Sequence, residues 1–269
     1  MDRPDLSVVF PAFNEELRLE RTIREAADYF RARGRPVELV TVDDGSRDGT
    51  SVLVRTLADE VAELRLIRLP ANRGQGYAVR TGLVNARGGR ILFADADGAT
   101  PMAEVERLDA ALDGGADVAI GSRAVASGEV RVRARLHRRL MGRTFHALVR
   151  LLTVDGIRDT QCGFKLFRAE AAHDLFSRMR MDGFSFDVEV LLMARRRGYG
   201  IAEVPVNWAH QPGSRVNLVT DSVRMAADLF AIRGHLLRGD YDRPQVAPLY
   251  TGTVPAMAGA GIVDPPPAA

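Results

Sequence analysis

The sequence predicts an α/β fold with a doubly wound, mainly parallel sheet that carries helices on both faces. Short apolar runs rich in Val, Ile and Leu alternate with longer segments of helical period, an order typical of parallel sheets. The runs are apolar throughout instead of at alternate positions, as expected for strands covered on both faces. Ligands of such sheets bind beyond the carboxyl ends of the strands. Three of the runs end in polar or acidic turns at that point.

The predicted elements of the first half follow one another in regular alternation. Strands are expected at residues 6–10, 37–42, 64–69, 90–94 and 118–121. Helices are expected between them, at residues 15–33, 48–61, 76–86 and 102–113. Asp48 and Thr50 can cap the second helix, and Pro101 suits the first turn of the fourth.

The pattern changes beyond residue 121. Residues 131–152 carry seven arginines and no acid, with leucine and phenylalanine at roughly helical spacing, which predicts a basic amphipathic helix. Later elements are a short strand and a helix after Lys165, a helix at 186–197, a strand at 201–208 and an amphipathic helix at 218–237. Proline, alanine and glycine dominate residues 241–269, where we expect a disordered tail.

Composition excludes several classes of protein. Cys162 is the only cysteine, so no intrachain disulfide can form, and the five histidines lack zinc-ligand spacing. The net charge of +2 provides no overall field for nucleic acid, and no nucleic-acid partner is expected. No run reaches the ~18 apolar residues that span a bilayer. We therefore expect a cytoplasmic protein that lies on a membrane surface without crossing it.

Two carboxylates follow the predicted strand at 90–94. Alternate residues of a strand share one face, so Asp95 and Asp97 can lie together before the Gly98 turn. Such a pair repels itself unless a cation lies between, and hard oxygen ligands suit Mg²⁺ or Mn²⁺ shared with a substrate phosphate. The alternative is a solvated loop with two acids. The position at the end of an apolar strand favours the metal site.

A second strand end and a glycine loop suggest a nucleotide pocket. Asp43 and Asp44 can accept hydrogen bonds from a base or a ribose, although turn and cap roles are the alternative; Asp48 is assigned to capping. The loop that contains Gly74 and Gly76 matches neither the dinucleotide fingerprint nor a P-loop. It predicts no more than a turn that lines this pocket.

Two features of the second half remain open between alternatives. The basic segment at 131–152 could be a solvated face, a nucleic-acid surface or a helix on an anionic membrane. The membrane fits both its arginines and its leucines, whereas no aromatic stacking platform supports nucleic acid. Asp159, between a loop and a glycine turn, is well placed for a base, with a turn acid as the alternative. Cys162 is expected to be a small buried residue.

Eight motifs, in this order, resemble the inverting family 2 glycosyltransferases with a GT-A, Rossmann-like fold. They are PAFNE, VDDGSRDGT, NRGQGYAVRTG, DADGATP, GSR, DTQCGFKLF, FDVE and VPVNWAHQPGSRV. Within that family the chain is most similar to the dolichyl-phosphate β-glucosyltransferases, over residues 6–238. The resemblance implies one domain at 1–240, with a nucleotide-binding part at about 6–122 and an acceptor part at about 123–240.

The resemblance also implies an activity and a set of site residues. It implies that glucose passes from UDP-glucose to a polyprenyl phosphate, with Mg²⁺ or Mn²⁺ held by Asp95 and Asp97. Arg123 would meet the acceptor phosphate, and Asp159 corresponds to the acid proposed as catalytic. The remaining substrate-binding residues that it implies are Pro11, Phe13, Glu15, Asp43, Asp44, Gly74, Gly76, Gln161, Lys165 and Arg215.

Alternatives to this reading stay open. The mannosyl relatives share the framework, so GDP-mannose is an alternative donor and a soluble molecule an alternative acceptor. A nucleotide-sugar-binding module without turnover is another. Eukaryotic relatives carry an N-terminal membrane-spanning helix that this sequence lacks, so we expect peripheral docking through residues 131–152 and 218–237 on the cytoplasmic face. The sequence sets neither the oligomeric state nor the lipid length.

Overall fold

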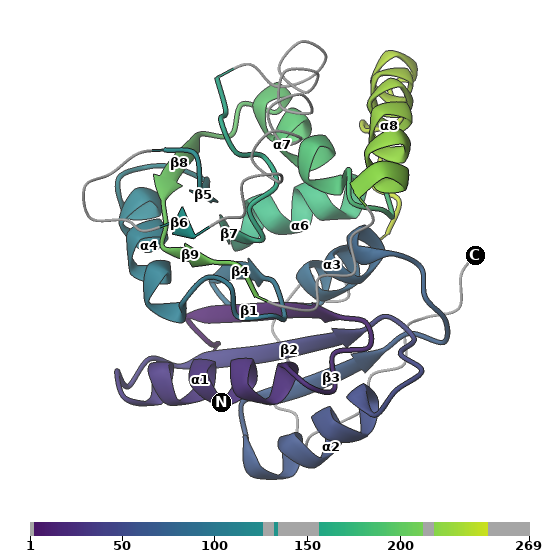
Figure 1. Ribbon diagram of the computed structural model, residues 1–269. Coiled ribbons are helices and arrows are strands. Elements are labelled where there is room, and N and C mark those ends of the chain that lie inside the picture. The colour runs from purple at the N-terminus through teal and green to yellow at the C-terminus, as the bar shows by residue number, and fades with distance from the viewer. Residues whose placement is uncertain (1–2, 126–131, 134–155, 212–217, 247–269) are drawn as a thin grey trace.

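A seven-stranded sheet forms the centre of the computed structural model, which describes residues 3–125, 132–133, 156–211 and 218–246 (Figure 1). The strand order is β3-β2-β1-β4-β7-β5-β8. The strands are β1 (Leu6–Ala12), β2 (Val37–Asp43), β3 (Leu64–Arg68), β4 (Arg90–Ala94), β5 (Val118–Ser122), β7 (Phe164–Arg168) and β8 (Ile201–Pro205). A second sheet pairs β6 (Val132–Arg133) with β9 (Trp208–Ala209). The predicted α/β class with a mainly parallel sheet is confirmed.

Helices cover both faces of the main sheet. The helical elements are α1 (Leu19–Arg31), α2 (Thr50–Glu60), α3 (Gln75–Val84), η1 (Met102–Glu104), α4 (Val105–Asp113), α6 (Ala169–Arg178), α7 (Phe186–Arg196) and α8 (Leu218–Arg238). Neighbouring strand residues such as Val8 and Val9 belong to two different apolar clusters. Helices α1, α2 and α4 supply one cluster, and α3, α6, α7 and α8 the other. This two-sided burial explains why the strands are apolar throughout.

Strand β7 is the exception to the parallel order, and its direction assembles the site. It pairs antiparallel with β4 and with β5, whereas the other strand pairs of this sheet are parallel. Phe164 at its beginning lies opposite Ala94 at the end of β4, and Lys165 lies opposite Ile120 of β5. The loop before β7 therefore meets the residues that follow β4 and β5.

Several element boundaries differ from those predicted. Helix α1 begins at Leu19 instead of residue 15, because a turn precedes it in which the Glu15 carbonyl accepts the Arg18 and Leu19 N–H groups at 3.1 and 3.0 Å. The strand predicted at 201–208 ends at Pro205, a residue without an N–H for the ladder, and β9 follows in the other sheet.

The basic segment predicted as a helix at 131–152 is a strand where it is described. Val132 and Arg133 form β6, because their backbones pair with Trp208 and Ala209. That part of the prediction is wrong. The rest of the segment lies outside the described residues, so its helical prediction stays a prediction.

The first residues of the predicted tail, 241–246, are ordered in the structure. Tyr241 is buried, and the Gln245 and Val246 N–H groups donate to the Ser177 carbonyl of α6 at 2.7 and 3.2 Å. The prediction of disorder is therefore wrong for 241–246, and 247–269 lie outside the described residues. Within the described ranges, no helix combines the length and the apolar character needed to cross a bilayer.

Candidate active site

Asp95 and Asp97 lie together directly after β4. Gln75, the first residue of α3, donates from Nε2 to Asp95 Oδ1 at 3.1 Å, and the Ala99 N–H donates to Asp97 Oδ1 at 3.0 Å. Burial, followed by the negative charges of Asp97 and Asp187, raises the pKa of Asp95 to about 7. The shift has two sources, removal of the carboxyl from water and the like charges near the end of this strand.

Gly163 permits the close approach of the β7 loop to Asp95. The Asp95 N–H donates to the Gly163 carbonyl at 2.9 Å. A Cβ on residue 163 would overlap the Asp95 carboxylate. Glycine is therefore required at 163 by contact with Asp95, and a side chain there would displace the carboxylate.

The two acids at the end of β2 are buried and hydrogen-bonded within the protein. Asp43 accepts hydrogen bonds from the Ser46 N–H at 2.9 Å and from the Ser51 hydroxyl. Asp44 accepts bonds from Asn72 Nδ2 at 2.9 Å and from the N–H groups of Arg73 and Gly74, each at 2.8 Å. Burial raises the pKa of Asp44 to about 6. These contacts favour the turn-stabilising alternative over direct contact with a base.

The glycines of the loop before and within α3 serve close packing. Gly74 has a φ of 108°, and a Cβ there would overlap the Asp182 carbonyl. A Cβ on Gly76 would overlap the Met181 carbonyl. The Asp182 carbonyl also accepts the Tyr77 N–H at 3.2 Å. These contacts hold the beginning of α3 in place, and with it Gln75.

The end of β1 lies beside the end of β2. Pro11 is buried in β1 opposite Val42, while Phe13 beyond the strand is half-buried. Glu15 pairs with Arg18 at 2.5 Å. The predicted residues of the nucleoside pocket are thus neighbours in space, although Glu15 is already engaged with an arginine.

Arg123 and Asp159 form a bidentate ion pair between the end of β5 and the loop before β7. The Arg123 N–H donates to Asp159 Oδ2 at 2.9 Å, and its guanidinium donates to Oδ2 and Oδ1 at 2.7 and 2.8 Å. Burial would raise the pKa of Asp159, but the charge and hydrogen bonds of Arg123 outweigh it and lower the pKa to about 2. Trp208 of β9 lies with its ring centroid 5.5 Å from the guanidinium carbon.

Lys165 is tied to a second acid instead of pointing into open space. Its Nζ donates to Asp187 Oδ1 and to the Cys162 carbonyl, both at 2.6 Å, and its side chain is 2% exposed. Gln161 donates weakly from Nε2 to Met225 Sδ of α8 at 3.8 Å. Cys162 is fully buried, and burial raises the pKa of its thiol to about 12. Arg215 lies outside the described residues.

A family model described as glycosyl transferase family 2 matches residues 7–176. The chain belongs to this family. It is 40% identical over 247 residues to the human dolichyl-phosphate β-glucosyltransferase, covering 87% of this chain and 76% of that one. The enzyme of the same name from Saccharomyces cerevisiae is 38% identical over 254 residues, with coverage of 88% and 76%. That of Dictyostelium discoideum is 34% identical over 251 residues, with coverage of 89% and 77%.

A solved structure supports the fold of this family 2 glycosyltransferase. The glucosyl-3-phosphoglycerate synthase from Mycobacterium tuberculosis, in complex with Mn²⁺, UDP and glucosyl-3-phosphoglycerate, superposes with a TM-score of 0.63 at 22% identity. The match covers 90% of this chain and 81% of that one. The predicted GT-A class of this glycosyltransferase is therefore confirmed.

The carboxylate pair of the glycosyltransferase fits a divalent cation that shares its ligands with a substrate. In the described part of the chain, no three His, Cys, Asp or Glu side chains converge as a larger metal cluster. Sites of this kind commonly use one or two carboxylates plus substrate phosphates. Burial and, after it, the negative charge of Asp97 raise the pKa of Asp95, and a bound cation would offset both effects. The Asp95 and Asp97 carboxylates, completed by substrate phosphates, therefore fit Mg²⁺ or Mn²⁺.

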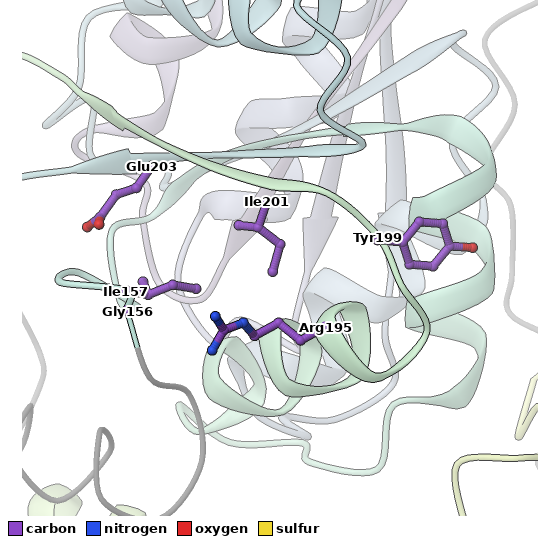
Figure 2. Close-up of a pocket in the computed structure, with 6 residues that line it drawn as sticks. All are labelled: Gly156, Ile157, Arg195, Tyr199, Ile201 and Glu203. Carbon is purple, nitrogen blue, oxygen red and sulfur yellow. The ribbon is translucent and has the colours of Figure 1, made fainter.

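Three residues of the glycosyltransferase site were not predicted. Asp187 belongs to the FDVE motif, so the resemblance contained a pointer to it. Gln75 lies in the NRGQGYAVRTG motif, although its bond to Asp95 joins segments far apart in the chain. Glu203 lies in none of the quoted motifs, and its acceptance of the Asp159 N–H depends on a contact that no local pattern identifies. Glu203 also lines a cavity of about 330 Å³, together with Gly156, Ile157, Arg195, Tyr199 and Ile201 (Figure 2).

Proposed function

We propose that this glycosyltransferase moves glucose from UDP-glucose to a polyprenyl phosphate with inversion, which yields a lipid-linked β-glucosyl phosphate. One observation carries the proposal. The carboxylates of Asp95 and Asp97 and the Arg123–Asp159 ion pair lie together near the beginning of β7. Asp95 and Asp97 suit the donor diphosphate with its cation, and Arg123 with Asp159 suits the acceptor phosphate. Similarity to enzymes named dolichyl-phosphate β-glucosyltransferases supports the choice of sugar and acceptor.

On the donor side, Asp95 and Asp97 would hold Mg²⁺ or Mn²⁺. When bound, the ion would supply Lewis-acid stabilisation of the departing nucleoside diphosphate. A structural relative that contains Mn²⁺ and UDP supports this assignment. Gln75 keeps Asp95 oriented, and the residues around Pro11 and Phe13 form a wall for the nucleoside.

On the acceptor side, Arg123 would bind the phosphate and Asp159 would orient Arg123. A phosphate monoester with a second pKa near ~6 is largely ionised at neutral pH, so the acceptor needs no strong base. Asp159, with a pKa of about 2 and both oxygens on Arg123, is a poor proton acceptor. An acceptor oxygen attacks the anomeric carbon on the face opposite the diphosphate. The new bond to oxygen forms as the bond to the diphosphate breaks.

We also propose that α8 contributes to docking on the cytoplasmic face of a membrane. Phe230 and Leu237 of this helix are 65% and 81% exposed. Arg233 and Arg238 lie near them on the same helix and are exposed. Exposed apolar residues beside arginines are typical of helices that rest on anionic lipid. The arginine-rich segment at 131–152, most of which lies outside the described residues, is the second candidate for docking.

A transfer assay with labelled donors tests the proposed function. The purified chain is incubated with radiolabelled UDP-glucose or GDP-mannose, with Mg²⁺ and with polyprenyl phosphate. We expect label in the lipid phase from UDP-glucose and not from GDP-mannose. Label from GDP-mannose instead would favour the mannosyl alternative. Tight binding of UDP-glucose without any labelled lipid would favour a binding module and contradict the proposal.

A further inference from the structure

Glu203 of β8 collects three hydrogen-bond donors from two other segments. Its Oε1 accepts the Ser122 hydroxyl and the Asp159 N–H, each at 2.8 Å. The Arg158 N–H reaches both Glu203 oxygens at 3.1 Å. Glu203 pairs with Ile120 in the sheet, so this carboxylate is anchored on the strand next to β5.

The donors belong to the two segments that carry the Arg123–Asp159 ion pair. Ser122 directly precedes Arg123, and its Oγ also accepts the N–H groups of Ala124 and Val125 at 3.2 Å. The bond from the Asp159 N–H fixes the backbone of the other partner. One carboxylate therefore ties the end of β5 to the loop before β7.

Glu203 also lies at the wall of a cavity. Figure 2 shows Glu203 and Arg195 among the side chains that line a space of about 330 Å³. A side chain at residue 203 that made none of these bonds would leave the end of β5 and the loop before β7 without their shared acceptor. The loop at 158–159 would then lose a fixed acceptor for two N–H groups.

We propose that Glu203 is a positioning residue for the Arg123–Asp159 pair, and through it for the acceptor phosphate. The identity of the acceptor rests on the proposed function. Glu203 acts by fixing backbone on both sides of the pair, and it touches neither the guanidinium nor the reacting atoms. A carboxylate is suited to this place because both of its oxygens accept hydrogen bonds and neither donates one.

The variant Glu203→Gln tests the proposal, because its amide NH₂ would face the Arg158 N–H as a second donor. We expect kcat/KM for polyprenyl phosphate to fall roughly 10- to 100-fold, while the Kd for UDP is unchanged. Glu38→Gln is the matched control. Glu38 of β2 is likewise a strand carboxylate, and it also accepts a serine hydroxyl, from Ser7 at 2.6 Å, and a backbone N–H, from Arg87 at 3.0 Å.

Amide hydrogen exchange gives a readout that does not depend on turnover. Glu203→Gln should speed exchange at residues 124, 125, 158 and 159, and Glu38→Gln should not. Wild-type protein that glucosylates no polyprenyl phosphate would contradict the proposed function, and the exchange rates would still test the position of the loop. Unchanged exchange in Glu203→Gln would overturn the proposal. So would an equal loss of UDP binding and transfer, or the same transfer defect in Glu38→Gln.

Discussion

At the scale of single residues, the carboxylate pair depends on Gly163. We expect Gly163→Ala to weaken Mn²⁺-dependent binding of UDP by about tenfold or more, because its Cβ would overlap the Asp95 carboxylate and move it. Calorimetric titration of UDP with and without Mn²⁺ measures the loss. Gly183→Ala is the control, since a Cβ there meets nothing within 4 Å. Equal UDP affinity in the two variants would contradict the packing argument.

The pKa of Asp95 predicts how cation binding varies with pH. Burial and the charge of Asp97 raise this pKa to about 7 in the protein without metal, so the carboxyl is mostly protonated below that pH. A cation needs the ionised form and displaces the proton. Affinity for Mn²⁺ should therefore fall about tenfold per pH unit below pH ~7 and level off above it. Titrations across that range check this, and an affinity independent of pH would contradict it.

Asp159→Asn separates orientation of Arg123 from base catalysis. We expect kcat/KM for the acceptor to fall by about 100-fold or less, because Arg123 loses its charged partner. UDP affinity should be unchanged. The pH profile should keep the wild-type ionisation near pH ~6, which belongs to the acceptor phosphate. If that ionisation disappears from the Asp159→Asn profile, Asp159 is the titrating base and the orientation role is wrong.

At the scale of elements, α8 is tested as a docking helix. Replacing Phe230 and Leu237 by glutamine should reduce recovery with anionic liposomes, because two exposed apolar side chains no longer enter the lipid. Sedimentation with anionic and neutral vesicles measures the change. Leu17 and Val52 provide the matched control, since they are 91% and 66% exposed in the turn before α1 and on α2. Equal loss on replacing the control pair would show that α8 has no special part in docking.

The strands also show that local sequence does not predict strand direction or strand pairing. A short strand is predicted after Lys165, and β7 is found at Phe164–Arg168. Residues 164–168 predict neither the direction of β7 nor its place between β4 and β5, because the hydrophobic periodicity of a parallel strand and of an antiparallel strand is the same. The pairing depends on a long connection and on partners distant in the chain. The β6–β9 sheet is likewise a product of long-range contact.

At the scale of the whole molecule, the order of strands and helices could be predicted from the sequence, and part of the site with it. The apolar runs placed five strands of the first half within two residues of their observed ends. The acidic turns pointed to Asp95 and Asp97, since a strand ends there. The engagement of Asp44 with the glycine loop, and of Lys165 with Asp187, could not be predicted, because each contact depends on side chains brought together only by folding.

The place of β7 makes the two halves of this glycosyltransferase inseparable as modules. β5 precedes residue 123, yet its partners in the sheet are β7 and β8, both from the second half. A chain cut after residue 125 would keep β5 without either neighbour, and β4 would lose β7. The amino-terminal fragment would then expose unpaired strand edges and aggregate. Donor and acceptor functions are interleaved in a single sheet, so exchange of one half between relatives would require exchange of the shared strand as well.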